Sequence, residues 1–350
     1  MDLNAHVKLQ TACLLAIALI AVGFLLKITS AFMIPFTIAV LLVIVISPAE
    51  RWLRARRVPG GLATGLVLFG LFLLMTGLGL LVYDSIRAVT RGLEPYVARG
   101  RALLLQLDGL AQERLGVSVL DGFGSNGGSL SDVITSRHAI QTINASLGSF
   151  MGFLSGLLMT LLFLLFILGS RELFKRKVDR LLEERFDDEG RDELLETIAR
   201  QVQEYLLLKT AISLCTGAAV WLVAFAFGLD FAIVWGFLAF VLNYIPSLGP
   251  IVAATPPIVI AFLQYEHAWL AALVSGLMLA IQFVSGNIVE PKVMGDRLNL
   301  NIVAVLMSLF VWGLVWGFAG MVLSVPLTAC LNIVMANSRR FKGASTWLSG

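Results

Sequence analysis

Charged residues are scarce in this sequence. Asp, Glu, Lys and Arg make up 14% of its 350 residues, whereas an average soluble domain contains roughly 25%. Hydrophobic residues make up 58%, and the mean hydropathy is +0.88. This composition excludes a soluble globular chain and predicts an all-α polytopic membrane protein. The formal net charge of +3 is too small for a nucleic-acid-binding protein, so we expect no nucleic-acid partner.

Cysteine and histidine are also scarce. The three cysteines lie within apolar segments and the three histidines lie in separate regions, so spacing identifies no metal-ligand cluster. The sequence contains no HExxH motif, no paired intramembrane Asp and no convincing Ser/His pairing within the apolar runs. We therefore expect no metal and no cofactor, and a protein that is not an enzyme.

Long apolar runs, by contrast, recur along the whole chain. A membrane-spanning helix needs about 20 mostly apolar residues. The sixth and eighth runs are too long for one straight helix, so we predict about eight membrane segments, with broken or re-entrant helices near 231–264 and 302–336. The runs are 11–27, 31–48, 62–82, 148–169, 208–228, 231–264, 268–286 and 302–336.

Basic residues gather after the second, fourth and last spans. Such clusters mark cytoplasmic loops, and they predict that both termini are cytoplasmic, with the first span an uncleaved signal anchor. A loop as long as 83–147 translocates regardless of its charge. The predicted organisation is spans one to three in 1–82, an extracytoplasmic insertion in 83–147, span four in 148–169, cytoplasmic amphipathic helices in 170–207, a membrane core carrying PSLGP and EPKVMG in 208–338, and a cytoplasmic tail in 339–350.

Both segments outside the spans have helical patterns. In the insertion, leucines recur at helical spacing from Leu103 to Leu110, and Ser129 with Asp132 has the form of a capping box. We predict a small helical subdomain with a flexible tip at 121–129. In 170–207, two apolar stripes predict two amphipathic helices that are broken near 187–190.

The stretch VLNYIPSLGPIVAATPP, residues 241–257, interrupts the sixth run. Pro246 and Pro250 remove two backbone donors, and Gly249 permits a positive φ, so we predict that the helix ends near Tyr244. Two topologies remain open. The run is either one kinked span or a hairpin of two half-length helices that turns at PSLGP. GFAG (317–320) and then Pro326 are predicted to interrupt the eighth run in the same way.

Broken helices with polar ends are a recognised way to build a transporter site. We predict that the polar groups near the break, together with Gln264 and others on neighbouring apolar runs, hydrogen-bond a small hydroxylated or carbonyl solute. The alternative is that they satisfy backbone groups freed by the break, or for Gln282 that it bonds a neighbouring helix. The predicted pathway residues are Asn243, Tyr244, Pro246, Ser247, Gly249, Pro250, Gln282 and Asn287.

Ionisable residues near the apolar runs are candidates for ion coupling, because charge within a membrane is costly. Glu290, just beyond the seventh run, and Asp230, at a boundary of the sixth, are the two candidates. Lys209 is predicted to lie at the start of span five. All three positions are read as interfacial.

The motifs resemble a known family. NYIPSLGPIVAATPP, NIVEPKVMGDRLNLNIVAVLMSLFVWGLVWGFAGMVLSVPLTA (287–329) and PFTIAVLLVIVISPAERWL (35–53) resemble the signature regions of the autoinducer-2 exporter family of bacterial inner-membrane proteins. The resemblance implies about eight membrane segments of the usual spanning length, a periplasmic insertion between spans three and four, and homo-oligomers, expected as pentamers. It also implies export of small molecules, with autoinducer-2 as the substrate of some members and sodium/proton antiport for others.

Three functions follow as hypotheses. The first is an exporter of a small polar solute. The sequence has no GxxxxGKS motif, so we expect export to depend on a gradient rather than on ATP. The second is a sodium/proton antiporter, for which Glu290 or Asp230 is essential. The third is a non-transporting membrane scaffold or receptor whose outer insertion binds a partner.

Overall fold

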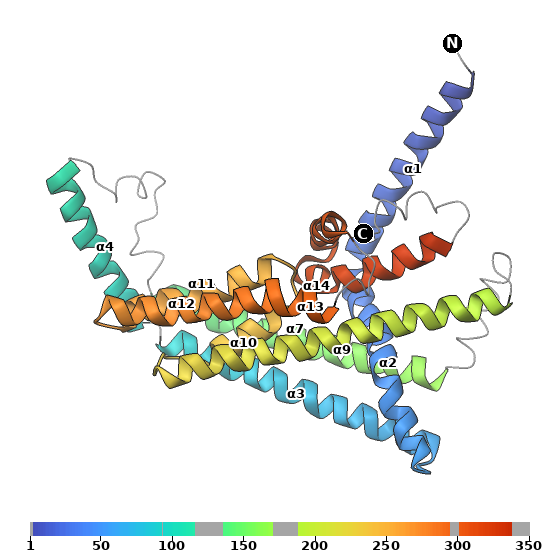
Figure 1. Cartoon of the computed structure of the whole chain (residues 1–350), viewed down its shortest axis with the longest axis horizontal. Coiled ribbons are helices and arrows are strands. Elements are labelled where there is room, and N and C mark those ends of the chain that lie inside the picture. Colours follow the sequence, from blue (N-terminus) through green and yellow to red (C-terminus); the bar gives the residue numbers. More distant parts are fainter. Residues whose placement is uncertain (1–2, 93, 116–135, 171–187, 295–300, 338–350) are drawn as a thin grey trace. The chain divides into compact units, whose positions relative to one another are not determined.

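The computed structural model describes residues 3–92, 94–115, 136–170, 188–294 and 301–337. Within these ranges the chain is helical and contains no strand, in agreement with the predicted all-α class. The helices are α1 (Leu3–Ile28), α2 (Ser30–Ala55), α3 (Gly60–Gly92), α4 (Glu94–Leu115), α7 (Ser136–Gly169), α9 (Asp188–Ala226), α10 (Ala232–Leu242), α11 (Leu248–Gln264), α12 (Ala268–Val284), the π-helix η1 (Ser285–Val289), α13 (Glu290–Met294) and α14 (Ile302–Asn337) (Figure 1).

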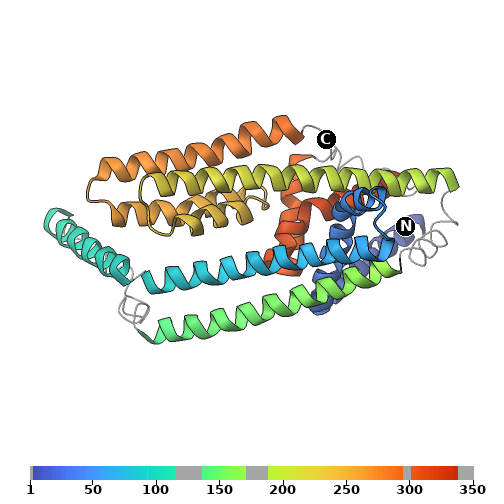
Figure 2. The same cartoon turned by 90° about the horizontal axis from the view of Figure 1, so that it is seen from below.

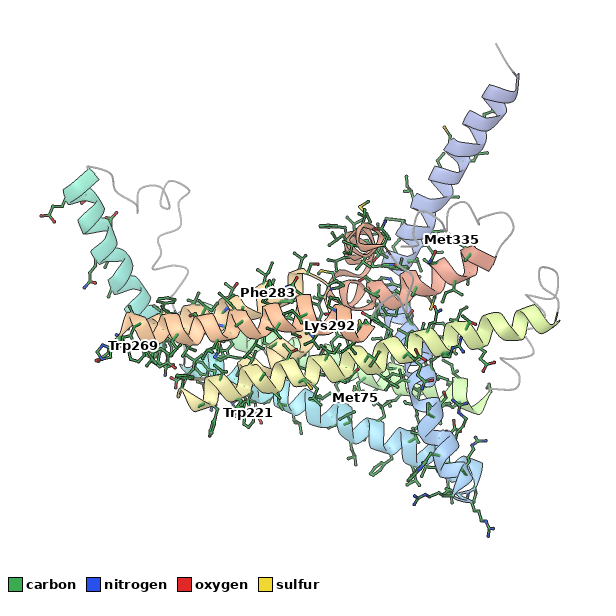
Figure 3. The ribbon with its side chains drawn as sticks, in the orientation of Figure 1. Met75, Trp221, Trp269, Phe283, Lys292 and Met335 are labelled. Atoms are coloured by element: carbon green, nitrogen blue, oxygen red, sulfur yellow. The ribbon has the colours of Figure 1, made fainter. Side chains whose placement is uncertain are left out.

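Five of the described helices are long and apolar enough to cross a membrane. They lie within α2, α3, α9, the α12 to α13 stretch and α14, while α10 and α11 are shorter apolar helices. Large apolar side chains remain exposed along these segments, as Figure 3 shows for Trp221 on α9 and for Trp269 and Phe283 on α12. In lipid such exposure carries no penalty, because the surrounding chains are themselves apolar. These features define a multi-pass helical membrane protein.

The described chain divides into two compact units. The first comprises residues 1–72, 156–210 and 292–350, and the second comprises 73–155 and 211–291. In the first unit, Leu41, Val202, Trp316 and Leu323 form a buried apolar cluster. The indole Nε1 of Trp316 also donates a hydrogen bond of 3.0 Å to the Leu26 carbonyl. This core therefore joins α1, α2, α9 and α14.

The last helix of the first unit folds back on itself. Gly317 has φ 59° and ψ −136°, which is not helical. Trp312 Nε1 nevertheless donates to Thr328 Oγ1 at 3.2 Å, although 16 residues of unbroken helix would separate them by about 24 Å. The predicted break in 302–336 is thus confirmed at Gly317. The prediction that Pro326 also interrupts this run is wrong, because Pro326 lies inside the helix that follows.

In the second unit, α10 and α11 form an antiparallel helical hairpin, and the two helices lie side by side in both cartoon views (Figures 1 and 2). The backbone N–H of Asp230, just before α10, donates to Oε1 of Gln264 at the end of α11 over 2.8 Å. One kinked span of this length would place these residues about 50 Å apart. The hairpin is therefore the topology of this segment, and the predicted end near Tyr244 is confirmed by the end of α10 at Leu242.

Two glycines let α9 and α10 approach closely within the second unit. A Cβ atom added to Gly217 would lie 2.7 Å from the Gly236 carbonyl oxygen, and one added to Gly236 would lie 2.5 Å from Cβ of Trp221. Real Cβ atoms do not make such contacts, so only glycine fits at either position. This contact holds the hairpin against α9.

The two segments outside the predicted spans are described in part. The leucine pattern from Leu103 to Leu110 lies in α4, which confirms a helix there. The capping box at Ser129 and the tip at 121–129 lie outside the described residues. Span four belongs to a longer helix than predicted, since α7 begins at Ser136.

The first of the two apolar stripes predicted in 170–207 also lies outside the described residues, in the range 171–187. The second stripe belongs to α9, which begins at Asp188 and continues without interruption to Ala226. No helix boundary therefore separates this stripe from span five. The predicted break near 187–190 coincides with the start of α9.

Candidate functional site

The connection between α10 and α11 is a tight turn. Ser247 is exposed and has φ 60°, a left-handed conformation that is uncommon for residues with a side chain. Pro246 lies half-buried in the turn. Pro250 lies in the first turn of α11. The N–H groups of a first turn have no acceptor within the helix, so the missing N–H of proline costs no helical hydrogen bond there. The prolines thus end one helix and permit the next to begin.

Gly249 is required in this turn for a reason other than the predicted one. The prediction of a positive φ at Gly249 is wrong, because the left-handed residue is Ser247. A Cβ atom on Gly249 would instead lie 1.8 Å from the carbonyl oxygen of Leu242. The close approach of the two helix ends therefore excludes every side chain at position 249.

Asn243, the first residue after α10, is buried with 1% of its surface exposed. Its Nδ2 donates a hydrogen bond of 3.0 Å to Oγ of Ser213 on α9. Its carbonyl oxygen Oδ1 is buried without a hydrogen-bond partner among the described residues. The neighbouring Tyr244 is half-buried and packs edge-on against Phe240, with ring centroids 5.8 Å apart.

A second hydroxyl contact joins α9 to the π-helix. Thr216 Oγ1 and Ser285 Oγ are buried and lie 2.5 Å apart. Thr216 Oγ1 also donates a hydrogen bond of 2.8 Å to the Ile212 carbonyl. One turn before Ser285, Gln282 is buried with its Oε1 unpartnered among the described residues. Oγ of Ser275, two turns further back on α12, is in the same state.

These six residues form a continuous feature that we term the buried polar strip. Ser213 and Thr216 are three residues apart on α9, and Gln282 and Ser285 are three residues apart across α12 and η1, so each pair shares a helix face. Asn243 bonds Ser213 of the first pair. Ser285 of the second pair bonds Thr216 of the first pair. The strip consists of Ser213, Thr216, Asn243, Ser275, Gln282 and Ser285.

The strip contains hydrogen-bond acceptors that no donor among the described residues satisfies. A buried polar group without a partner costs about 1–3 kcal/mol, and two of the three orphaned atoms are amide carbonyl oxygens, which only accept hydrogen bonds. Each of these two oxygens can accept a hydrogen bond from a hydroxyl or N–H donor. Chemically, the strip offers neutral hydrogen-bond acceptors.

Two further predicted residues lie in the π-helix and directly after it. Asn287 is exposed, and its Nδ2 donates to the Phe283 carbonyl at 3.2 Å. Glu290 is half-buried at the start of α13, and its backbone N–H bonds the Ser285 carbonyl. Single-turn π-helices occur frequently at functional sites because they re-aim the side chains beside them.

Asp230 belongs to a different polar cluster, which we term the loop clasp and which consists of Tyr96, Asp230, Gln264 and Tyr265. The Tyr96 hydroxyl donates to the Asp230 carboxylate. Oε1 of Gln264 accepts a hydrogen bond from the Asp230 backbone N–H, and its Nε2 donates one of 2.7 Å to the Gly228 carbonyl. The Tyr265 hydroxyl donates a hydrogen bond of 3.0 Å to the Phe227 carbonyl. Each of these side chains therefore bonds a loop or a neighbouring helix.

The clasp changes the acidity of Tyr96. Burial of the phenol raises its pKa above the usual value, and the hydrogen bond to Asp230 raises the pKa further. The phenol therefore remains protonated and continues to donate to the carboxylate at physiological pH. This contact ties the beginning of α4 to the loop before α10.

The structure thus brings Asn243 and Gln282 into one strip, with Tyr244 beside the turn. It places Asp230 in the clasp and leaves Ser247 and Asn287 exposed. The hydroxyl members of the strip were missed by sequence reasoning. Serine and threonine are common in membrane helices, but the pairing of Ser213 and Thr216 just before Gly217 was an available signal.

The burial of two ionisable residues in the first unit was also missed. Lys209 is predicted at the interfacial start of span five, yet it lies well inside the continuous helix α9 with 1% of its surface exposed. Glu50 on α2 is 2% exposed and accepts hydrogen bonds from Arg54 and Thr64. Within the described residues, no group of three or more His, Cys, Asp or Glu is placed to hold a metal ion.

Comparison with known proteins identifies the family of this multi-pass helical membrane protein. The chain belongs to the AI-2E transporter family, whose model matches residues 14–340. The AI-2 transport protein TqsA of Escherichia coli K12 is 32% identical over 316 residues, which cover 90% of this chain and 89% of TqsA. A Haemophilus influenzae protein named "Putative transport protein" is 31% identical over 338 residues, which cover 96% of this chain and 94% of that protein. The resemblance drawn from the motifs is thereby confirmed, and the family and the relatives' names indicate a membrane transporter.

Proposed function

We propose that this protein exports a small polar solute across the bacterial inner membrane and that the buried polar strip binds the solute during transport. The observation that carries the proposal is the pair of orphaned amide oxygens on Asn243 and Gln282. Natural proteins rarely leave such groups unsatisfied unless a ligand or water completes them. Their position beside a broken helix agrees with the way that transporter sites are built.

The chemistry of the strip favours a neutral solute with hydroxyl groups. The orphaned amide oxygens accept hydrogen bonds but carry no net charge. Autoinducer-2, the solute in the name of TqsA, is therefore the first substrate to test. We further propose that the α10–α11 hairpin is re-entrant, because 11 residues of α10 extend only about 16 Å and a bilayer core is about 30 Å thick.

The test is efflux of labelled autoinducer-2 from liposomes that contain the purified protein, beside protein-free vesicles and a Gln282→Met variant. Methionine has a similar shape and lacks the acceptor, so we expect the variant to assemble normally and to transport about tenfold more slowly than the wild type. If the Gln282→Met variant transports as fast as the wild type, the strip is not part of the transport pathway. Absence of efflux by folded wild-type protein would exclude autoinducer-2 as the substrate.

Sodium/proton antiport is a second candidate, and one observation favours it. Glu290 is half-buried immediately after the π-helix, and an ionisable group at such a position can carry a proton or bind a cation. The decisive variant is Glu290→Gln, assayed by sodium-driven proton movement with a pH-sensitive dye inside the vesicles. Antiport requires that the wild type moves protons and that the variant does not.

A further inference from the structure

The connection between α2 and α3 in the first unit carries a concentrated positive charge. Arg51, Arg54, Arg56 and Arg57 lie within seven residues and are all exposed. We term these four residues the basic corner. Both α2 and α3 are long and apolar enough to cross a membrane, so the corner lies where two spans meet the headgroup region.

One of the four arginines holds the corner together. Glu50 is buried, and its Oε1 accepts hydrogen bonds from Nη2 of Arg54 at 2.6 Å and from Oγ1 of Thr64 at 2.8 Å. The second bond joins α2 directly to α3. Within the described part of the chain, no acidic side chain forms an ion pair with any of the other three arginines. Their charge is therefore available to a ligand.

Arg57 occupies a position that favours glycine. The N–H of Val58 bonds the Leu53 carbonyl at 3.3 Å, and the N–H of Arg57 bonds the Arg54 carbonyl at 3.0 Å. This pair of hydrogen bonds is a Schellman motif, whose left-handed residue is usually glycine. Here Arg57 takes that conformation, with φ 65°. A conformation that is unfavourable for arginine, retained in the structure, indicates a use for its side chain.

The remaining features of the corner suit a membrane surface. The guanidinium of Arg56 lies 4.2 Å from the ring centroid of Trp52, whose side chain is 56% exposed. Tryptophan is enriched at the membrane–water interface. The first amides of α3, from Gly60 onward, have no acceptor within the helix and form its positive end. Cationic side chains, an interfacial indole and a helix amino end thus occur together.

We propose that the basic corner binds the phosphate of an anionic phospholipid headgroup, through Arg56 and Arg57 on the framework that Glu50 and Arg54 hold in place. Guanidinium groups bind phosphate through paired hydrogen bonds. The competing account is that the arginines only neutralise the carboxyl end of α2 or set topology. That account requires charge but gives no reason for arginine at a left-handed position.

The test uses the full-length protein in nanodiscs of phosphatidylcholine with increasing phosphatidylglycerol, and it measures the rise in melting temperature with anionic lipid. The key variant is Arg57→Gly, which removes the charge and relieves the backbone. We expect it to melt at the same or a higher temperature than the wild type in pure phosphatidylcholine, and to require about fivefold more phosphatidylglycerol for the same stabilisation. Arg56→Gln tests the second cation independently of the backbone.

Two controls make the result specific. Arg57→Lys keeps the charge and should retain most of the lipid response, whereas Arg91→Gln removes an exposed arginine at the other end of α3 and should retain all of it. A full phosphatidylglycerol response in both Arg57→Gly and Arg56→Gln would overturn the proposal. An equal loss in Arg91→Gln, or equal stabilisation of the wild type by inorganic phosphate alone, would also overturn it.

Discussion

Two polar clusters lie in the second unit, and they differ in how their hydrogen bonds are satisfied. In the loop clasp, Gln264 uses both ends of its amide to bond backbone groups of the loop before α10. In the buried polar strip, Gln282 has a carbonyl oxygen without a partner among the described residues. Satisfied groups of this kind stabilise a fold, whereas an orphaned buried group is retained at a cost. The comparison shows one residue type in two states, satisfied in the clasp and orphaned in the strip. That difference supports our proposal that Gln282 binds solute.

The largest effect should come from the turn that positions the strip. Gly249→Val would drive a side chain into the Leu242 carbonyl, so we expect a loss of about 3 kcal/mol in folding free energy and no transport by the protein that still assembles. Thermal melting and vesicle efflux measure the two effects. Gly276→Ala is the matched control, because an added Cβ there meets nothing within 4 Å among the described residues. Normal efflux by assembled Gly249→Val would show that the turn has no part in transport.

The same substitution at the two glutamines sharpens the comparison most directly. Gln264→Met leaves two loop backbone groups without their partner, so we expect a loss of about 1–2 kcal/mol in stability with normal efflux per folded molecule. Gln282→Met removes an orphaned oxygen, so we expect unchanged or higher stability with strongly reduced efflux. The melting temperature should therefore fall only in Gln264→Met, and the efflux rate should fall only in Gln282→Met. If both variants lose stability equally, the two clusters do not differ in role.

Tyr96→Phe should have a smaller effect that is confined to stability. It removes the hydrogen bond to Asp230, so we expect a loss of about 1 kcal/mol and unchanged efflux below the melting temperature. Chemical or thermal denaturation measures the loss. Reduced efflux by fully folded Tyr96→Phe would instead give Asp230 and the clasp a part in transport.

The smallest expected effect is a dependence on high pH. The pKa of Tyr96 is raised on folding, so its contribution to stability is fully present below the unfolded pKa of about 10 and is lost as pH rises through the folded pKa. Between neutral pH and pH 9 we expect no change from this group. Above about pH 10, wild-type stability should fall more steeply than that of Tyr96→Phe. Parallel pH profiles from melting experiments would contradict this assignment.

The sequence was sufficient to predict the end of α10 and the break near Gly317, although not that the helix continues through Pro326. It did not predict the contacts that the breaks create. Pro246 and Pro250 act locally on the chain, so the end of α10 was predictable. The reason for glycine at 249 depends on how the next helix packs against Leu242, and no local pattern contains that information. The bond between Tyr96 and Asp230 joins residues 134 positions apart. Lys209 was assigned to a boundary because hydropathy rises there, although α9 continues across that point.

The central claim is that the orphaned acceptors of the strip bind hydroxyl groups of the solute. The most direct test is a binding cycle that compares autoinducer-2 with an analogue in which a hydroxyl is replaced by hydrogen, on the wild type and on Gln282→Met. Ligand-dependent rises in melting temperature report the four affinities. The account predicts that the wild type prefers the parent compound by about tenfold and that Gln282→Met binds both compounds equally. An undiminished preference in Gln282→Met, across every hydroxyl position tested, would contradict it.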